Sequence, residues 1–448
     1  MNAYKTQNIS LPLKIFLIII LIIILVSYFS LYAKGFTHYS GVDMPVIHSD
    51  GARYYSYLIS YILLEDLTFN EYIEAYTNKA NIRGFVYYDD TGNYLPTQTI
   101  GVAIMALPFF LSAYLLSMIF NYSLDGISIL FQHAYGLSGI FYGFLGIIFL
   151  VKILKKFFNE KIIILSIIAI IFGTNLFHYL TFDSGFSHSF SFFLFVLFCY
   201  ATIRWHENPR SYKYSIFLGL ILGFITLVRL TNIIAVFILL FYGVYDLKSL
   251  RKKILFFKQN LSRIIAIIIS SILSFLPQMI IWKIGSGRWI INPYQDEKLL
   301  AFPGHIIEVL FSVRAGLLFW SPMLVFSITG FYYLKKKDNG LFFPVLIFSV
   351  LNLLIIAGTR RWWYGASFGH RGFVESYSLL IFPVASFFSA IRLKKIKIIV
   401  LIFGILFICY SFLQMYFFWE AKILADNVDF QFYIDKFINL YNDFIKLF

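Results

Sequence analysis

The chain has 448 residues and a formal net charge of +14, yet only 13% of its residues are charged and 60% are hydrophobic. Its mean hydropathy of +0.77 and its apolar runs of nearly twenty residues predict a polytopic α-helical membrane protein and exclude a soluble globular domain. The basic residues lie in short clusters between these runs, so they indicate membrane orientation and no nucleic-acid partner. Cys199 and Cys409 both fall within apolar runs and suggest neither a disulfide framework nor a metal cluster.

The apolar runs predict a series of membrane crossings. The first run, 11–33, is too long for a cleaved signal peptide and is read as a retained span. The other expected crossings lie at 127–151, 161–180, 187–204, 213–229, 231–247, 261–284, 315–334, 341–358, 375–391 and 396–418. This gives about eleven transmembrane helices, with basic clusters on the cytoplasmic side. The loops around Asp183 and Arg229, and those at 285–314 and 359–374, then face outward.

The segment 98–120 breaks this alternation. If it crossed the membrane, the lysine cluster at 152–161 would lie outside, against the positive-inside rule. We therefore predict a re-entrant or interface-lying helix there, within a first outer loop over 34–126. The alternative, in which this segment crosses and another does not, stays open. Residues 1–418 would form the membrane domain, and 419–448 an outer tail with amphipathic spacing.

Polar residues that topology does not explain gather in the predicted outer loops. Asp50 and Arg53 follow the first span, at the start of a short surface helix, where a carboxylate is a functional candidate or a helix cap. Asp183 and His188 lie close together in the next outer loop and could face one cleft. For this pair, a helix-capping aspartate and a hydrogen-bonded structural histidine are the alternative.

The loop 360–371 contains three arginines on the outer side, against the positive-inside rule. The planar fork of arginine matches phosphate oxygens, and nearby glycines allow the backbone to approach an anion. The candidate ligands for substrate here are Arg361, Trp363, Tyr364, His370 and Arg371, and Arg229 joins them from the outer end of another span. The alternative is a structural loop anchored by its aromatic residues.

Several short motifs carry a resemblance to a known family. They are His48 to Tyr55, Tyr94 to Thr99, Phe186 to Ser189, Gly219 to Asn232, Ala315 to Pro322 and Trp363 to Arg371. Through the order of these motifs along the sequence, the chain resembles the GT-C glycosyltransferases. The resemblance is to their polyprenyl-phosphate-sugar-dependent branch, which includes protein O-mannosyltransferases and aminoarabinose transferases. The resemblance implies an all-α GT-C-like bundle with juxtamembrane helices in the first outer loop. Gly51 stands where the protein mannosyltransferases have a second acidic residue, which makes Asp183 the candidate for that role.

The resemblance implies transfer of a sugar from a polyprenyl-phosphate-linked donor to a hydroxyl of a glycan, lipid or protein. The site would face outward from the cytoplasmic (inner) membrane, with inversion at the sugar. Asp50 would be the general base. Arg371, His370 and Arg361 would hold the leaving phosphate. Asp183 and His188 would orient the substrates, and Arg53, Arg229, Trp363 and Tyr364 would bind them.

The cofactor and the class of activity stay open at this point. A divalent metal ion could assist, since oxygen ligands are available, but the sequence does not demand one. One alternative function is a transporter or flippase of a lipid-linked or anionic solute. It predicts charged residues near mid-membrane, and the spans contain very few. The other is an oligosaccharide ligase or polymerase that uses a diphosphate-linked donor.

Overall fold

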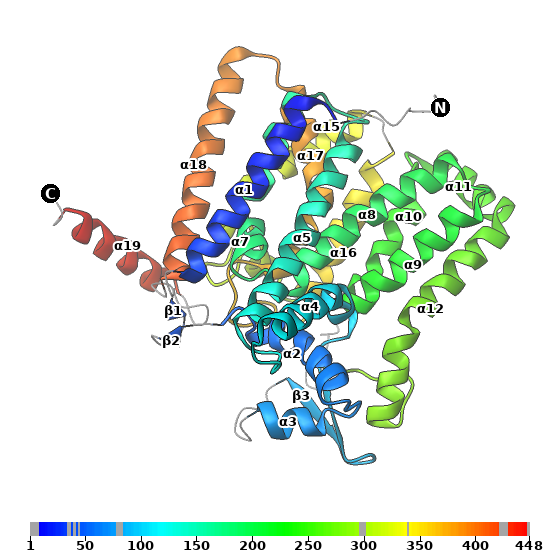
Figure 1. Ribbon diagram of the computed structural model, residues 1–448. Helices are drawn as coiled ribbons and strands as arrows, with labels where there is room; N and C mark the ends of the chain where they lie inside the picture. The colour runs from blue at the N-terminus through cyan, green and yellow to red at the C-terminus, as the bar shows by residue number, and fades with distance from the viewer. Residues whose placement is uncertain are drawn as a thin grey trace. The chain divides into compact units, whose positions relative to one another are not determined.

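The computed structural model describes residues 9–33, 37–38, 42–43, 45–77, 84–294, 302–337, 340–420 and 429–445. These residues form helices almost throughout, with two short antiparallel hairpins, β1–β2 and β3–β4 (Figure 1). The predicted all-α membrane class is thereby confirmed. The chain divides into two compact units, each built from separate stretches of sequence. Unit 1 comprises mainly Pro45–Leu150 and Asp183–Asp296, and unit 2 comprises Thr6–Met44, Val151–Phe182 and Glu297–Phe448.

Unit 1 contains the first outer loop and most of the central spans. Its elements are α2 (Ser49–Leu58), α3 (Asn70–Tyr76), β3 (Phe85–Tyr88), β4 (Asn93–Pro96), α4 (Gly101–Phe120), α5 (Ile129–Leu154, which continues into unit 2), α8 (Ser187–Glu207), α9 (Tyr212–Val228), α10 (Val236–Phe241), α11 (Leu247–Gln259) and α12 (Leu261–Ser286).

Unit 2 contains the first span and the C-terminal third of the chain. Its elements are α1 (Leu11–Ala33), β1 (Thr37–His38), β2 (Val42–Asp43), α6 (Glu160–Phe172), α7 (Leu176–Thr181), α13 (Ile306–Phe311), α14 (Leu317–Trp320), α15 (Val325–Lys337), α16 (Phe342–Ala357), α17 (Tyr377–Ala390), α18 (Lys394–Trp419) and α19 (Phe430–Ile445).

Six of the described helices are long and apolar enough to cross a membrane: α1, α4, α5, α8, α12 and α18. Some predicted crossings are interrupted helices. The segment 161–180 breaks at Gly173 into α6 and α7, and 315–334 breaks near Ser321 between α14 and α15. The count of about eleven crossings stays a prediction. So does an outer surface position for α19, which covers the described part of the C-terminal tail.

The α9–α12 pair shows how the sequence allows close helix packing in unit 1. Gly219 and Gly223 lie one turn apart on α9, and a side chain at either would collide with the backbone of α12. Small residues at this spacing allow the backbones of apolar helices to approach. The hydroxyl of Ser271 on α12 then donates to the carbonyl oxygen of Gly219 at 2.9 Å. This packing places the end of α9, and Arg229 directly after it.

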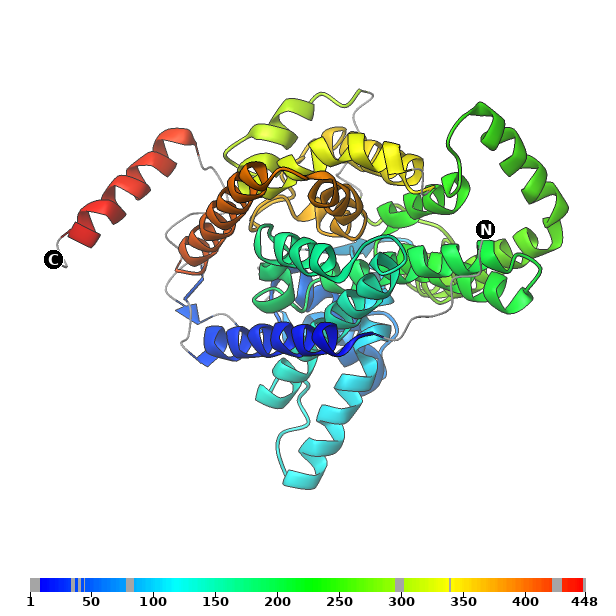
Figure 2. The same ribbon diagram turned by 90° about the horizontal axis from the view of Figure 1, so that it is seen from above.

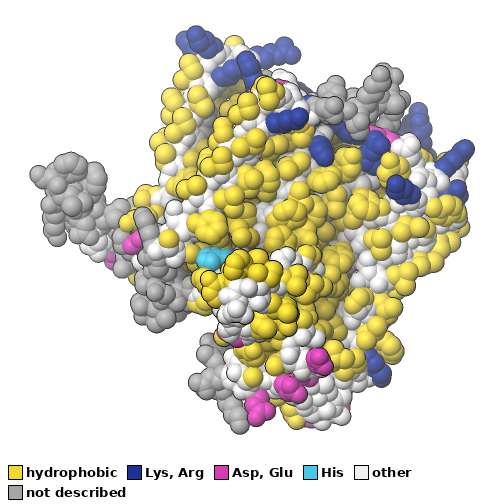
Figure 3. Space-filling model, in the orientation of Figure 1, with side chains coloured by type: hydrophobic (Ala, Val, Ile, Leu, Met, Phe, Trp, Pro, Cys, Tyr) yellow, Lys and Arg dark blue, Asp and Glu magenta, His cyan; other side chains and the backbone are white. Residues whose placement is uncertain are grey.

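Charged side chains of opposite sign gather at opposite ends of unit 1. Figure 3 shows Lys and Arg side chains around α11 and Asp and Glu side chains around α3 and β3, with hydrophobic side chains on the flanks between them. The basic end fits the cytoplasmic side of the positive-inside prediction, and the acidic end holds α2 and the first outer loop (Figure 1).

The helix α4, which covers most of the segment 98–120, runs crosswise to α9 in both ribbon views (Figures 1 and 2). Its start is tied to α12, because the backbone N–H of Ile100 donates to the side-chain oxygen of Gln278 at 2.8 Å. The direction of α4 fits a helix that does not follow the other spans of unit 1. Its re-entrant or interfacial placement stays a prediction.

Candidate active site

Asp50 lies in the first turn of α2, as the sequence predicts. The N-cap position belongs to His48, whose side chain makes no capping bond. Ser49 between them adopts a left-handed backbone with φ of 48°, an uncommon conformation for serine that is often found at functional sites. The Asp50 side chain is about 20% exposed. It is therefore partly screened from water but still accessible.

Two donors hold the Asp50 carboxylate by the same oxygen. Arg53 Nη1 donates to Oδ1 at 2.6 Å, one helical turn away, and Gln98 Nε2 donates to it at 3.4 Å. Arg53 itself packs against Gly84, where an added side chain would collide with the guanidinium group. Thr97, beside Gln98, donates its backbone N–H to the carbonyl of Gly84 at 2.8 Å. The segment before α4 thus fixes the direction of the carboxylate.

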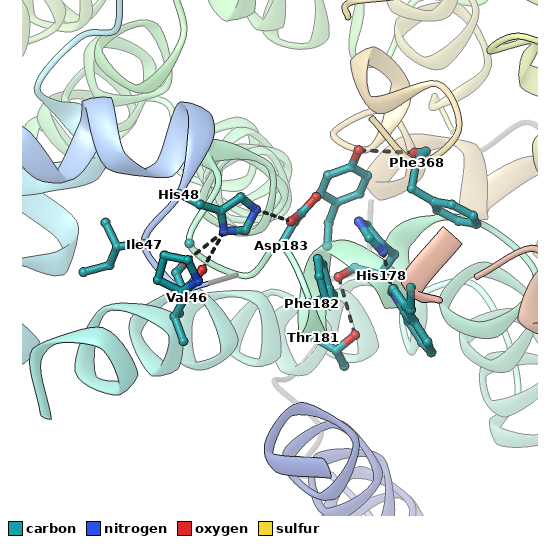
Figure 4. A network of polar contacts seen from close by, with 12 residues as sticks. Val46, Ile47, His48, His178, Thr181, Phe182, Asp183 and Phe368 are labelled. Atoms are coloured by element: carbon teal, nitrogen blue, oxygen red, sulfur yellow. Dashed lines mark hydrogen bonds and ion pairs between the residues drawn. The ribbon is translucent and has the colours of Figure 1, made fainter. Parts of the chain in front are cut away.

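Asp183 pairs with a histidine that precedes α2. Its Oδ1 lies 3.2 Å from Nε2 of His48, and both side chains are largely buried, with 7% and 9% of their surfaces exposed (Figure 4). On the other side of the ring, Nδ1 of His48 faces the backbone carbonyls of Pro45 at 2.9 Å and Val46 at 3.3 Å. Asp183 and the segment that leads to Asp50 therefore meet directly.

A second contact joins the same two segments through their backbones. The hydroxyl of Tyr135 on α5 lies 2.7 Å from the carbonyl oxygen of Gly185 and 3.1 Å from that of Gly51. A side chain at Gly51 would touch the backbone of Gly185, and one at Gly139 on α5 would overlap the carbonyl oxygen of Ser184. Gly139 therefore allows α5 and the turn 183–186 to approach at backbone distance, whereas the contact at Gly51 leaves room for a methyl group.

Arg229 places a positive charge beside His188 in unit 1. Nη1 of Arg229 lies 3.2 Å from Nδ1 of the buried His188. Because a guanidinium group can only donate, Nδ1 accepts and the ring hydrogen sits on Nε2. Tyr54 on α2 is influenced by both Arg229 and Asp50. Burial is the main cause that raises the pKa of Tyr54, and Tyr294 raises it further. Arg229 lowers this pKa, and Asp50 raises it by a smaller amount. The charges of Arg229 and Asp50 thus act on one phenol.

Unit 1 therefore contains five of the predicted site residues: Asp50, Arg53, Asp183, His188 and Arg229. Four further residues of this cluster were not candidates from the sequence: His48, Tyr54, Gln98 and Tyr135. Gln98 lies within the motif Tyr94 to Thr99, which was the available signal for it. His48 directly precedes Ser49 and Asp50, but its partner is remote in the sequence.

The predicted phosphate loop 360–371 lies in unit 2 and is held by residues of that unit. Nη2 of Arg371 donates to the backbone oxygen of Tyr364 at 2.6 Å, and Tyr364 has a left-handed φ of 57°. The guanidinium group of Arg314 stacks on the ring of Trp363 at 3.6 Å from its centroid, a cation–π contact. Arg371 is half-buried and Arg361 is exposed.

His370 lies among the aromatic rings of this loop, near those of Tyr364 and Phe373. Burial, and then the charge of Arg371, lowers the pKa of His370 to about 3. The imidazole is therefore neutral at physiological pH. If it contacts a phosphate, it does so as a neutral hydrogen-bond donor and not as a cation.

Among the described residues, no group of three or more His, Cys, Asp or Glu side chains is arranged to hold a metal ion. Asp50 and Asp183 are each engaged by a basic side chain instead.

No protein-family model matches the sequence, and no curated protein matches it either. A solved structure of the archaeal oligosaccharyltransferase AglB from Archaeoglobus fulgidus, in complex with an inhibitory peptide and a dolichol-phosphate, superposes with a TM-score of 0.50 at 13% identity, over 92% of this chain and 56% of that chain. The oligosaccharyltransferase of the same organism tethered to an acceptor peptide gives a TM-score of 0.46 at 13% identity, over 93% and 56%. Its apo form gives 0.45 at 13%, over 90% and 55%.

The chain thus spans just over half of the length of these structures. At this level of identity the first likeness concerns the fold alone. The chain therefore shares the fold of this solved oligosaccharyltransferase, which agrees with the polytopic helical fold that the sequence resemblance implied.

Proposed function

We propose that this chain is a membrane glycosyltransferase that moves a sugar from a polyprenyl-phosphate-linked donor to an acceptor hydroxyl, with inversion, at the outer face of the cytoplasmic membrane. The observation that carries the proposal is the Asp50 carboxylate, which is about 20% exposed and held by Arg53 and Gln98 at the start of α2. The GT-C fold supports glycosyl transfer, and the dolichol-phosphate bound to the solved oligosaccharyltransferase is a lipid phosphate of the class proposed here.

In the proposed reaction the acceptor oxygen attacks the anomeric carbon while the bond from that carbon to the phosphate oxygen breaks. The hydroxyl proton passes to Asp50, and the electron pair of the broken bond leaves with the polyprenyl phosphate. The ion pair with Arg53 holds the Asp50 carboxylate, which takes the proton, in a fixed position. Because both donors bind Oδ1, the carboxylate is oriented before the acceptor arrives, which is the condition for efficient general-base catalysis.

Substrate binding is assigned to other polar residues that the sequence predicted. Arg229 supplies a positive charge, and Nε2–H of His188 supplies a neutral donor beside it. Asp183 belongs to the framework that positions these groups. Arg371, with Arg361 and the neutral His370, remains our candidate for the leaving phosphate, and Trp363 and Tyr364 for stacking on the sugar.

The direct test is transfer by the purified chain in lipid nanodiscs. We expect radiolabelled sugar to leave a polyprenyl-phosphate donor in the presence of an acceptor, with release of polyprenyl phosphate and inverted configuration in the product. Transfer only from a polyprenyl-diphosphate oligosaccharide would favour the ligase or polymerase alternative. Movement of the intact donor across a vesicle membrane, without cleavage of its phosphate bond, would favour the flippase alternative.

The substitution Arg371→Lys tests the phosphate assignment. We expect kcat to fall by at least about tenfold with little change in thermal stability. Lysine keeps the positive charge but cannot form the bidentate hydrogen bonds that arginine makes with a phosphate. Arg360→Lys, at an exposed position in the same loop, is the matched control and should keep the wild-type rate. A lower unfolding temperature with unchanged kcat would show that Arg371 only anchors the loop through Tyr364.

A further inference from the structure

His48 is buried two residues before Asp50, and the proposed transfer reaction assigns it no step. Three oxygen atoms surround its ring: the carbonyl oxygens of Pro45 and Val46 near Nδ1, and Oδ1 of Asp183 near Nε2. Backbone carbonyls and an ionised carboxylate can only accept hydrogen bonds. A neutral imidazole has one hydrogen to give, whereas the doubly protonated ring satisfies both sides. The geometry therefore favours an imidazolium paired with the Asp183 carboxylate.

The electrostatic balance agrees with this geometry. Burial alone would lower the pKa of His48, but the hydrogen bond and the charge of Asp183, together with the two backbone carbonyls, outweigh burial and raise it. Other titratable groups near this segment are Asp50 and Arg53 on α2 and Tyr135 on α5. Asp183 supplies the charge that acts on the ring. Because both partners are largely buried, removal of one would leave the other uncompensated.

The His48–Asp183 pair joins the residue before α2 to the turn before α8. His48 is the last residue before α2, and Asp183 begins the turn that leads into α8. The backbone N–H of Ile47, next to His48, donates to the side-chain oxygen of Gln132 on α5 at 2.7 Å. The segment 45–48 is therefore held on two sides, and the first turn of α2, which carries Asp50, follows from it without a linker.

We propose that His48 is a positioning residue, a buried imidazolium that ties the Asp183 turn to the start of α2 and so sets the direction of the Asp50 carboxylate. This inference rests on the proposed role of Asp50 as the base. His48 touches no reacting atom in this scheme, and it acts through the two aspartates.

The substitution His48→Gln tests the positioning role. Glutamine can donate to Asp183 but cannot carry the charge or donate from two sides. We expect kcat to fall by about tenfold or more with an unchanged KM for the donor, because a displaced base affects the chemical step and not binding. Asp183→Asn should cost a similar factor, and the double variant should cost little more than either one alone, since both act through one pair.

The pH profile separates this role from a purely structural one. A histidine whose pKa is raised in the folded protein contributes below that pKa, and its contribution is lost as the pH rises through it. The wild-type kcat should therefore fall along an alkaline limb, and the His48→Gln variant should lack that limb. His305→Gln, which removes a more exposed histidine with Glu308 at 4.0 Å in unit 2, should leave the profile unchanged.

The protonation state can be read without any donor or acceptor. In ¹⁵N-histidine-labelled protein, the signals that disappear in His48→Gln should show both ring nitrogens protonated at neutral pH. A neutral ring, or a variant with the wild-type rate and pH profile, would overturn the inference. If the wild-type chain transfers no sugar while the ring is an imidazolium, the proposed function fails and the positioning role fails with it, but the ion pair stands.

Discussion

Replacement of Asp50 with asparagine should lower kcat for sugar transfer by about 10²- to 10⁴-fold, the range that a positioned general base contributes. Asparagine has nearly the same size, and its carbonyl oxygen can still accept from Arg53 and Gln98. It cannot take the proton of the acceptor hydroxyl. The KM for the donor should change little, because the lost interaction is made only in the transition state. Initial rates with a radiolabelled polyprenyl-phosphate sugar measure the effect.

The control for this substitution is another carboxylate of the first outer loop. Asp90 is 73% exposed and pairs with Arg288 at 3.4 Å, so Asp90→Asn removes one negative charge from the same loop without touching α2. It should transfer sugar at the wild-type rate. Wild-type transfer by Asp50→Asn itself would rule out the base assignment and leave Asp50 with a role in helix stability. Because asparagine also favours helix N-termini, a stability role predicts an almost silent substitution.

The predictions that succeeded rest on strong local patterns. Apolar runs and basic clusters predicted the membrane class, because the bilayer requires long apolar helices and the charge bias sets their orientation. The short helix that begins beside Asp50 was predicted for a similar reason, since its aromatic residues follow a surface-helix spacing. Breaks inside apolar runs were missed. Gly173 ends α6 and is followed by Thr174 and Asn175, so a short turn signal inside the apolar run was overlooked.

The contacts that organise the candidate site were not predictable from the same patterns. The partners His48 and Asp183 lie far apart in the sequence, and neither neighbourhood carries a signal that names the other. Substrate binding by Arg53 stays a prediction, and its pair with Asp50 across one helical turn was not foreseen. Gln98 was visible only as part of a motif without an assigned role. Such pairings follow from tertiary packing, which local periodicity does not encode.

Replacement of Gly139 with alanine should destabilise the protein and reduce transfer together. Gly139 lies on α5, where the new methyl group would overlap the carbonyl oxygen of Ser184. The obstacle is backbone, so no side chain can rotate away and the turn that follows Asp183 must move. Overpacking of this kind typically costs about 1–3 kcal/mol. The shift also moves Gly185, whose carbonyl oxygen lies 2.7 Å from the hydroxyl of Tyr135.

The matched control is Gly404→Ala on α18, where an added methyl group meets no atom within 4 Å. Both substitutions exchange glycine for alanine inside an apolar helix, so both gain the same helix propensity of about 1 kcal/mol. The difference between their unfolding temperatures therefore isolates the clash with Ser184. We expect Gly404→Ala to have an unchanged or higher unfolding temperature and full transfer activity. Gly139→Ala should have a lower unfolding temperature and lower transfer activity. Equal stability and activity in the two variants would mean that the Asp183 turn does not lie against α5, and the backbone contact that brings Asp183 to α2 would fall with it.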